Sequence, residues 1–166
     1  MRGRHQLSGR EMQAGYIIRN MQETPRLVLD TNVLVAASRN RQGRAFALMQ
    51  AVRSGQVRMC CSPPLFLEYE AVLKRAEQQA ASGWTALDVD AVLAELAALL
   101  EPVSLHYRWR PQLSDPADEM VLEAAVNAAA DALVTYNRRD FLAASRFGLA
   151  VLTPPEVWER FSLAKS

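Results

Sequence analysis

The stretch Leu27-Val28-Leu29-Asp30-Thr31-Asn32-Val33-Leu34 places one carboxylate at the point where an apolar strand passes into a helix. Residues suited to a buried strand precede Asp30, while Thr31 and Asn32 favour turns and helix caps. In an open α/β sheet such a junction lies at the carboxyl edge of the strand, where ligands usually bind. Two interpretations remain open from this stretch alone. Asp30 is either a cap of the next helix or part of a site at this edge.

The composition is that of an ordinary folded domain. The 166 residues suffice for one domain with a real core, and 50% of them are hydrophobic. A net charge of +1 argues against a broadly basic nucleic-acid binder. No apolar run approaches the roughly 20 residues that span a bilayer, and no secretory signal follows the N-terminal arginines. We therefore expect a cytoplasmic protein with no membrane partner.

The cysteines and histidines do not suggest a site of their own. Cys60 and Cys61 are adjacent in an apparent strand, and neighbouring cysteines seldom reach disulfide geometry. The histidines, His5 and His106, are far in sequence from both cysteines and from Asp30. Zinc binding, catalysis by a histidine base and a Ser-His arrangement are therefore disfavoured.

Strand and helix signals alternate from Pro25 onward, which is typical of an α/β fold with a parallel sheet. Strands are predicted over residues 26–30, 57–61, 101–105, 132–135 and 149–152. Helices are predicted over residues 33–38, 43–54, 63–80, 85–100, 116–130 and 154–161. Residues 1–24 lack clear periodicity, and we interpret them as a flexible extension, a remnant of cloning or an upstream mis-start before Met21. A single domain over residues 25–162 is therefore expected.

Acidic residues on the apolar face of a helix are informative, because most helical acids face solvent. Glu68 falls among the apolar positions of its predicted helix, and Asp118 extends the inward row of Leu122 by one turn. A carboxylate facing a core is costly unless a cation or hydrogen-bond donors accompany it. Simpler interpretations remain for each. In these interpretations, Glu68 pairs with an arginine, and the helix dipole stabilises the negative charge of Asp118. Asp115, which precedes Pro116, then caps its helix instead of touching a metal.

Asp140 lies just beyond the fourth predicted strand. If the first and fourth strands are neighbours, Asp30 and Asp140 leave the sheet at the same edge. Together with Glu68 and Asp118 they suggest a shared cation. Oxygen ligands without histidine or cysteine favour Mg²⁺ or Mn²⁺ over zinc. Such a site suits phosphodiester hydrolysis by metal-activated water.

Four motifs together resemble the PIN-domain nuclease family, and among its branches the VapC-like bacterial toxins. The motifs are Leu29-Asp-Thr-Asn-Val-Leu34, Glu68-Tyr-Glu-Ala-Val-Leu-Lys-Arg75, Asp115-Pro-Ala-Asp118 and Val134-Thr-Tyr-Asn137-Arg-Arg-Asp140-Phe141. The resemblance covers about residues 25–162. It implies a three-layer α/β fold, in which helices flank a central parallel five-stranded sheet of order 3-2-1-4-5.

The same resemblance implies roles for individual residues. The carboxylates implied as catalytic, and as ligands of one or two Mg²⁺ or Mn²⁺ ions, are Asp30, Glu68, Asp118 and Asp140. Asp140 would hold the metal either directly or through water. The residues implied as supporting this cluster are Thr31, Asn32, Asp115, Thr135 and Asn137.

By the same resemblance we expect a metal-dependent ribonuclease that is the toxin of a type II toxin-antitoxin system. RNA would be its substrate, and a second copy and a cognate antitoxin would be its partners. The helices predicted over residues 63–100 offer apolar surface for such a contact. Arginines in or beside the active edge could bind phosphates, although surface solubility explains them equally well. They are Arg39, Arg41, Arg44, Arg138 and Arg139.

Other functions compete with this hypothesis. A structure-specific DNA or RNA nuclease would use the same metal site. A catalytically degenerate RNA-binding module would keep only the fold, but the presence of all four carboxylates argues against it. A phosphate-accepting switch at Asp30 would need an acidic pair near the first strand and a lysine after the last strand. The chain offers neither.

Overall fold

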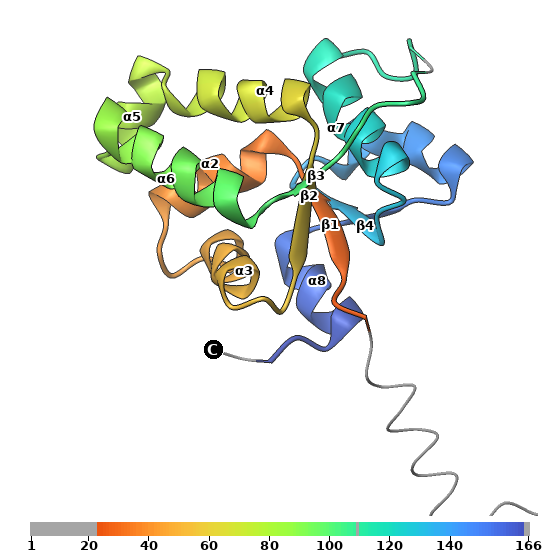
Figure 1. Cartoon of the computed structure of the whole chain (residues 1–166), viewed down its shortest axis with the longest axis horizontal. Coiled ribbons are helices and arrows are strands. Elements are labelled where there is room, and N and C mark those ends of the chain that lie inside the picture. Colours follow the sequence, from red (N-terminus) through yellow and green to blue (C-terminus); the bar gives the residue numbers. More distant parts are fainter. Residues whose placement is uncertain (1–22, 109, 165–166) are drawn as a thin grey trace, which may run out of the picture.

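The computed structural model describes residues 23–108 and 110–164 (Figure 1). Its centre is a five-stranded sheet in which every neighbouring pair is parallel, in the order β3-β2-β1-β4-β5. This confirms the expected sheet order. The strands are β1 (Arg26–Leu29), β2 (Arg58–Cys61), β3 (Glu101–Pro102), β4 (Ala132–Val134) and β5 (Ala150–Leu152).

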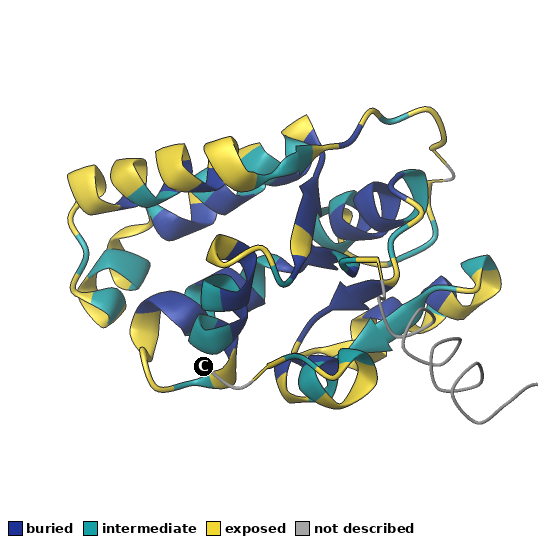
Figure 2. Cartoon of the chain, turned by 60° about the horizontal axis from the view of Figure 1, so that its bottom comes forward, coloured by how far each residue is buried: buried dark blue, intermediate teal, exposed yellow. Residues whose placement is uncertain are grey.

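The central strand β1 is the most deeply buried part of the sheet. Leu27 pairs with Met59 of β2 on one side and with Ala132 of β4 on the other. Leu27, Val28 and Leu29 are all fully buried, as Figure 2 shows for the core of the sheet. A continuous apolar run of this kind is typical of a strand covered on both faces. Because the strands are parallel, the residues that follow β1 and β4 emerge at the same edge.

Helices cover both faces of the sheet. In Figure 1, α2, α3, α5 and α6 lie on one side of the strands, and α7 and η1 lie on the other. The helices are α2 (Thr31–Arg39), α3 (Arg44–Arg53), α4 (Pro63–Leu73), α5 (Ala76–Ser82), α6 (Ala86–Leu99), α7 (Pro116–Asn127), the 3-10 segment η1 (Arg138–Phe147) and α8 (Pro154–Phe161). Among the described residues, no helix is both long enough and apolar enough to cross a bilayer.

The single helix predicted over residues 63–80 is wrong, because the chain breaks between α4 and α5. Arg75 is extended, with φ −62° and ψ 139°. No glycine or proline marks the break. Instead, Lys74 forms ion pairs with Glu70 and with Asp90 of α6, at 2.8 and 2.7 Å. The change of direction brings α5 against α2, where Arg39 donates a hydrogen bond to Gln78.

Other boundaries also differ from the prediction. The strand expected over residues 101–105 is only Glu101–Pro102, because the chain then leaves the sheet toward α7. There the side chain of Asn127 accepts hydrogen bonds from the N–H groups of His106 and Tyr107, at 2.8 and 2.9 Å. The η1 segment was not predicted. The proposed extension over residues 1–24 falls almost wholly outside the described residues, so the division into extension and domain stays a prediction.

The two cysteines lie in the core. Cys60 and Cys61 of β2 are buried and are not joined in a disulfide. Burial raises the pKa of Cys61 to about 12. Both thiols are therefore neutral packing groups at physiological pH.

Candidate active site

Asp30 is a buried carboxylate at the junction of β1 and α2. The residue is 7% exposed and occupies the N-cap position of α2. It makes no side-chain cap hydrogen bond, although the N–H groups of Thr31 and Asn32 are close enough to lower its pKa. Burial outweighs these effects, and the pKa of Asp30 is raised. Capping alone therefore does not account for this carboxylate.

A hydroxyl from the neighbouring strand holds Asp30. Thr135, directly after β4, donates from Oγ1 to Oδ2 of Asp30 at 2.7 Å. The same Oγ1 accepts from Nδ2 of Asn32 at 3.2 Å and from the N–H of Asn137 at 3.0 Å. The N–H of Tyr136 donates to Oδ1 of Asn32 at 3.3 Å. The ends of β1 and β4 are thus joined by a hydrogen-bonded network around Asp30.

Tyr69 supports the end of β1 from the other side. The hydroxyl of this fully buried residue of α4 donates to the carbonyl oxygen of Leu29, which precedes Asp30. The N–H of Asp30 bonds to β4, so the carbonyl of Leu29 points toward β2, where the pairing has already ended at Leu27 and Met59. The sequence marks Tyr69 only as an apolar helix position. Its hydroxyl contact with a residue 40 positions away has no local signal.

A polar hollow of about 340 Å³ is lined by carboxylates whose charges interact with Asp30. Asp115 and Asp118 from the start of α7, and Arg139 and Asp140 from η1, contribute to its wall, together with residues 112–114 of the preceding loop. Burial raises the pKa of Asp118 to about 6, and the charges of Asp30, Asp115 and Asp140 add to this effect. Carboxylates from three distant segments therefore act on one another at this edge.

The remaining predicted acids differ in their surroundings. Asp115 caps α7, because its Oδ1 accepts from the N–H of Ala117 at 2.8 Å, and it also lines the hollow. Glu68, near the middle of α4, is partly buried. It does not line the hollow, and it forms no ion pair with any residue that the structure describes. The interpretation of Glu68 as an arginine partner is therefore wrong for the described residues.

The donor chemistry of this edge fits a hard divalent cation. The carboxylates of Asp30, Asp118 and Asp140 act on one another here, and a cation would relieve the repulsion that adds to the effect of burial on the pKa of Asp118. Among the described residues, no three acidic, histidine or cysteine side chains are already gathered tightly enough to enclose an ion. Asp30, Asp118 and Asp140 are the set whose charges act on one another, and Asp140 is exposed to solvent, whereas Glu68 of α4 is not among the charges that act on Asp30 or Asp118.

The predicted phosphate-binding arginines do not form one cluster. Arg139 lines the hollow beside the carboxylates, whereas Arg39 donates to Gln78 of α5. Arg44 places its guanidinium 5.7 Å from the ring centre of Trp158 in α8. Arg138 forms an ion pair with Glu156 at 3.0 Å, and Arg41 is exposed in the turn between α2 and α3. Of the predicted arginines, Arg139 is the one that lines the acidic hollow.

Two buried acids of α7 were missed by the sequence reasoning. Glu119 and Glu123 are 4% and 5% exposed. Oε1 of Glu119 accepts from the N–H groups of Gln112 and Leu113, and Glu123 pairs with Arg110 at 2.6 Å. Their spacing of four residues places them on one helix face, which was a signal available in the sequence. They fix the loop that forms part of the hollow.

Comparison with known proteins agrees with this architecture. A family profile described as PIN domain matches residues 26–139, which is more than half of the chain. A chain of the solved structure of FitAB bound to IR36 DNA fragment is 16% identical, and the match covers 84% of this chain and 98% of that chain with a TM-score of 0.51. Curated proteins give no significant match. At this identity the solved structure supports the fold alone, whereas the extent of the profile match shows the family. The chain belongs to the PIN-domain family, whose members are generally nucleases that use divalent metal ions.

Proposed function

We propose that this protein is a metal-dependent endoribonuclease, and that Asp30, Glu68, Asp118 and Asp140 are its catalytic carboxylates. One observation carries the proposal. Asp30 after β1, Asp118 in α7 and Asp140 in η1 lie close enough for their charges to raise the pKa of Asp118. Acids so far apart in sequence are not brought together by helix capping or by the helix dipole.

The residues of the site divide into groups with different tasks. Asp30, Asp118 and Asp140, with Glu68, would hold one or two Mg²⁺ or Mn²⁺ ions. When bound, the metal supplies an activated water and neutralises charge on the phosphate. Thr135 fixes the direction of the Asp30 carboxylate through its 2.7 Å hydrogen bond. Arg139, on the wall of the same hollow, is placed to hold a phosphate beside the carboxylates.

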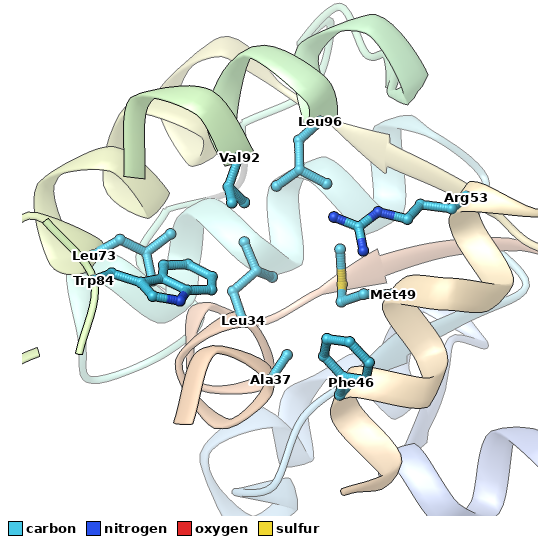
Figure 3. Close-up of a pocket in the computed structure, with 9 residues that line it drawn as sticks. All are labelled: Leu34, Ala37, Phe46, Met49, Arg53, Leu73, Trp84, Val92 and Leu96. Carbon is cyan, nitrogen blue, oxygen red and sulfur yellow. The ribbon is translucent and has the colours of Figure 1, made fainter. Parts of the chain in front are cut away.

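The toxin role and its partners belong to the same proposal. The motifs that resemble the VapC-like branch favour RNA as substrate, with a cognate antitoxin and a second copy as partners. An apolar pocket between α2, α3 and α6 offers a surface for the antitoxin (Figure 3). Leu34, Phe46, Met49, Trp84 and Val92 line it, and Figure 3 shows the Arg53 guanidinium at its side. We propose that apolar side chains of the antitoxin enter this pocket.

Exposed leucines on α4 and α6 suit the second copy. Leu67 of α4 is 63% exposed, and Leu87 and Leu99 of α6 are 78% and 40% exposed. Light scattering of the purified protein at several concentrations measures the dimer. Leu67→Glu should shift it toward the monomer, and a wild-type protein that stays monomeric at high concentration contradicts the dimer.

Co-purification with the antitoxin, and its loss in Val92→Glu, tests the pocket.

The nuclease is tested with purified protein and matched substrates. Single-stranded RNA, single-stranded DNA and a flap of the same sequence are incubated with Mg²⁺, with Mn²⁺ or with excess chelator. We expect metal-dependent cleavage of RNA that falls by orders of magnitude in Asp30→Asn and is unchanged in Glu159→Gln, an exposed acid of α8. Cleavage that persists in chelator and in Asp30→Asn would refute the proposal.

The other candidate functions give different results in the same experiment. A structure-specific nuclease cleaves the flap or the DNA faster than the RNA, with the same metal dependence. A degenerate binding module cleaves nothing, although it binds RNA. Isothermal titration with Mn²⁺ then shows whether the carboxylates bind metal at all, and circular dichroism shows that each variant is folded.

A further inference from the structure

Tyr136 is an exposed aromatic residue next to the hydrogen-bonded network around Asp30. The proposed nuclease mechanism gives it no role. It lies between Thr135, which holds Asp30, and Asn137, whose N–H bonds to Thr135. The residue is 44% exposed. An exposed aromatic residue that directly follows Thr135 is a candidate contact for a ligand that approaches Asp30.

Tyr136 is held through its backbone and through its hydroxyl. Its backbone N–H donates to Oδ1 of Asn32 at 3.3 Å. Its hydroxyl interacts with the N–H of Ala45 in the first turn of α3, a helix whose N-cap, Gly43, has no side chain to serve that turn. The ring therefore spans from the end of β4 to the start of α3. Little conformational freedom remains for it to lose when a ligand binds.

Tyr136 and the hollow lie toward opposite sides of the sheet. The hollow is bounded by α7 and η1, whereas Tyr136 reaches toward α3, and Figure 1 shows these elements on opposite sides of the strands. Asp30 emerges from the central strand between them. A nucleic-acid strand that places its phosphate at the carboxylates therefore extends past the ring on the α3 side.

Cationic groups flank this side of the site. Arg138 follows two residues after Tyr136, with a side chain that is 56% exposed, and Arg44 lies next to Ala45 at the start of α3. Among the described residues, the Arg138 guanidinium contacts Glu156 and the Arg44 guanidinium contacts the ring of Trp158, and both arginines are exposed to solvent. Proteins bind single-stranded nucleic acid with exposed aromatic rings and cationic groups, and Tyr136 offers such a ring two residues before Arg138.

We infer that Tyr136 stacks on an unpaired base of the substrate, next to the nucleotide whose phosphate lies at the carboxylates. The inference rests on the proposed nuclease function and adds a requirement for an unpaired base. A base in a duplex is stacked on its neighbours and is not available to the ring. Tyr136 is thus a substrate-positioning residue that favours single-stranded segments or loops.

The test measures binding without cleavage. Asp30→Asn protein is titrated into a single-stranded RNA that carries the fluorescent base 2-aminopurine at successive positions. Stacking on Tyr136 should quench one position. Tyr136→Phe and Tyr136→Trp should retain the quenching and most of the affinity, because they keep a ring although they lose the hydroxyl contact with Ala45. Tyr136→Leu should lose the quenching and bind roughly 10-fold or more weakly.

Two controls separate stacking from a structural role. Tyr107→Leu removes an exposed tyrosine at the opposite end of α7 from Asp118 and should bind as the parent does. An RNA that lacks the base at the quenched position should weaken binding of the parent protein by the same factor as Tyr136→Leu, with no change in the protein. If Tyr136→Phe and Tyr136→Leu lose affinity equally, or if the missing base has no effect, the inference is wrong.

The result also distinguishes the inference from the proposed function. RNA that quenches at one position but is never cleaved by wild-type protein with metal supports the stacking and refutes the nuclease. Metal-dependent cleavage whose KM is the same for wild type and Tyr136→Leu supports the nuclease and refutes the stacking. If both hold, Tyr136→Leu should raise KM and leave kcat nearly unchanged, because the ring does not contact the scissile phosphate.

Discussion

The raised pKa of Asp118 predicts that Asp118→Asn stabilises the protein near neutral pH. The pKa rises from 3.8 to about 6, and burial is the first cause. A carboxyl group with a raised pKa in the folded state binds its proton more tightly there than in the unfolded state. Its destabilising effect is therefore absent below about pH 3.8 and complete above about pH 6.

The expected size follows from the shift. About two pKa units correspond to about 3 kcal/mol as an upper limit. Asp118 is only partly buried, so solvent screens its interactions, and the dipole of α7 favours its ionised form. We expect Asp118→Asn to raise the free energy of unfolding by roughly 1 kcal/mol near pH 7.5, and to change it little near pH 4.

Urea denaturation of both proteins in chelator, near pH 7.5 and near pH 4, measures this difference. Glu159→Gln serves as the control, because it removes one exposed acid near the end of α8. It should leave the free energy of unfolding unchanged at both pH values. Excess Mg²⁺ near pH 7.5 should stabilise wild type more than Asp118→Asn, because the cation neutralises the carboxylate charge of Asp118, which the variant lacks. Equal effects of Asp118→Asn at both pH values, or a loss of stability near neutrality, would refute the reasoning.

The remaining predictions concern groups that hold the site in place. Thr135→Val removes the hydroxyl donor of Asp30 and should lower the free energy of unfolding by about 1–3 kcal/mol in a urea titration; unchanged stability contradicts this. Tyr69→Phe leaves the carbonyl of Leu29 without this donor and should lower the free energy of unfolding by about 1–2 kcal/mol, measured by thermal unfolding. A change near zero would contradict this. Glu119→Gln should speed hydrogen exchange at the amides of residues 112 and 113, and full protection there would show that the carboxylate does not hold the loop.

Much of the architecture could be read from local patterns. The apolar run before Asp30 and the alternation of strands and helices predicted a parallel α/β sheet, because burial of a strand or a helix face leaves a periodic trace in the sequence. The strand order came from the resemblance of the motifs to a family, since periodicity alone does not say which strands are neighbours. The break after Lys74 had no such trace, because it accompanies ion pairs with Asp90 on another helix and with Glu70.

The sequence by itself was enough to predict which residues would supply the proposed chemistry: Asp30 at a strand end, Asp118 on an inward helical row and Asp140 beyond another strand. Only the tertiary structure decided what surrounds them. Thr135 reaches Asp30 across 105 residues, and the carboxylates meet because β1 and β4 are neighbours in the sheet. Hydrogen bonds and charge interactions between distant residues depend on strand register and helix placement, and neither leaves a local pattern in the chain.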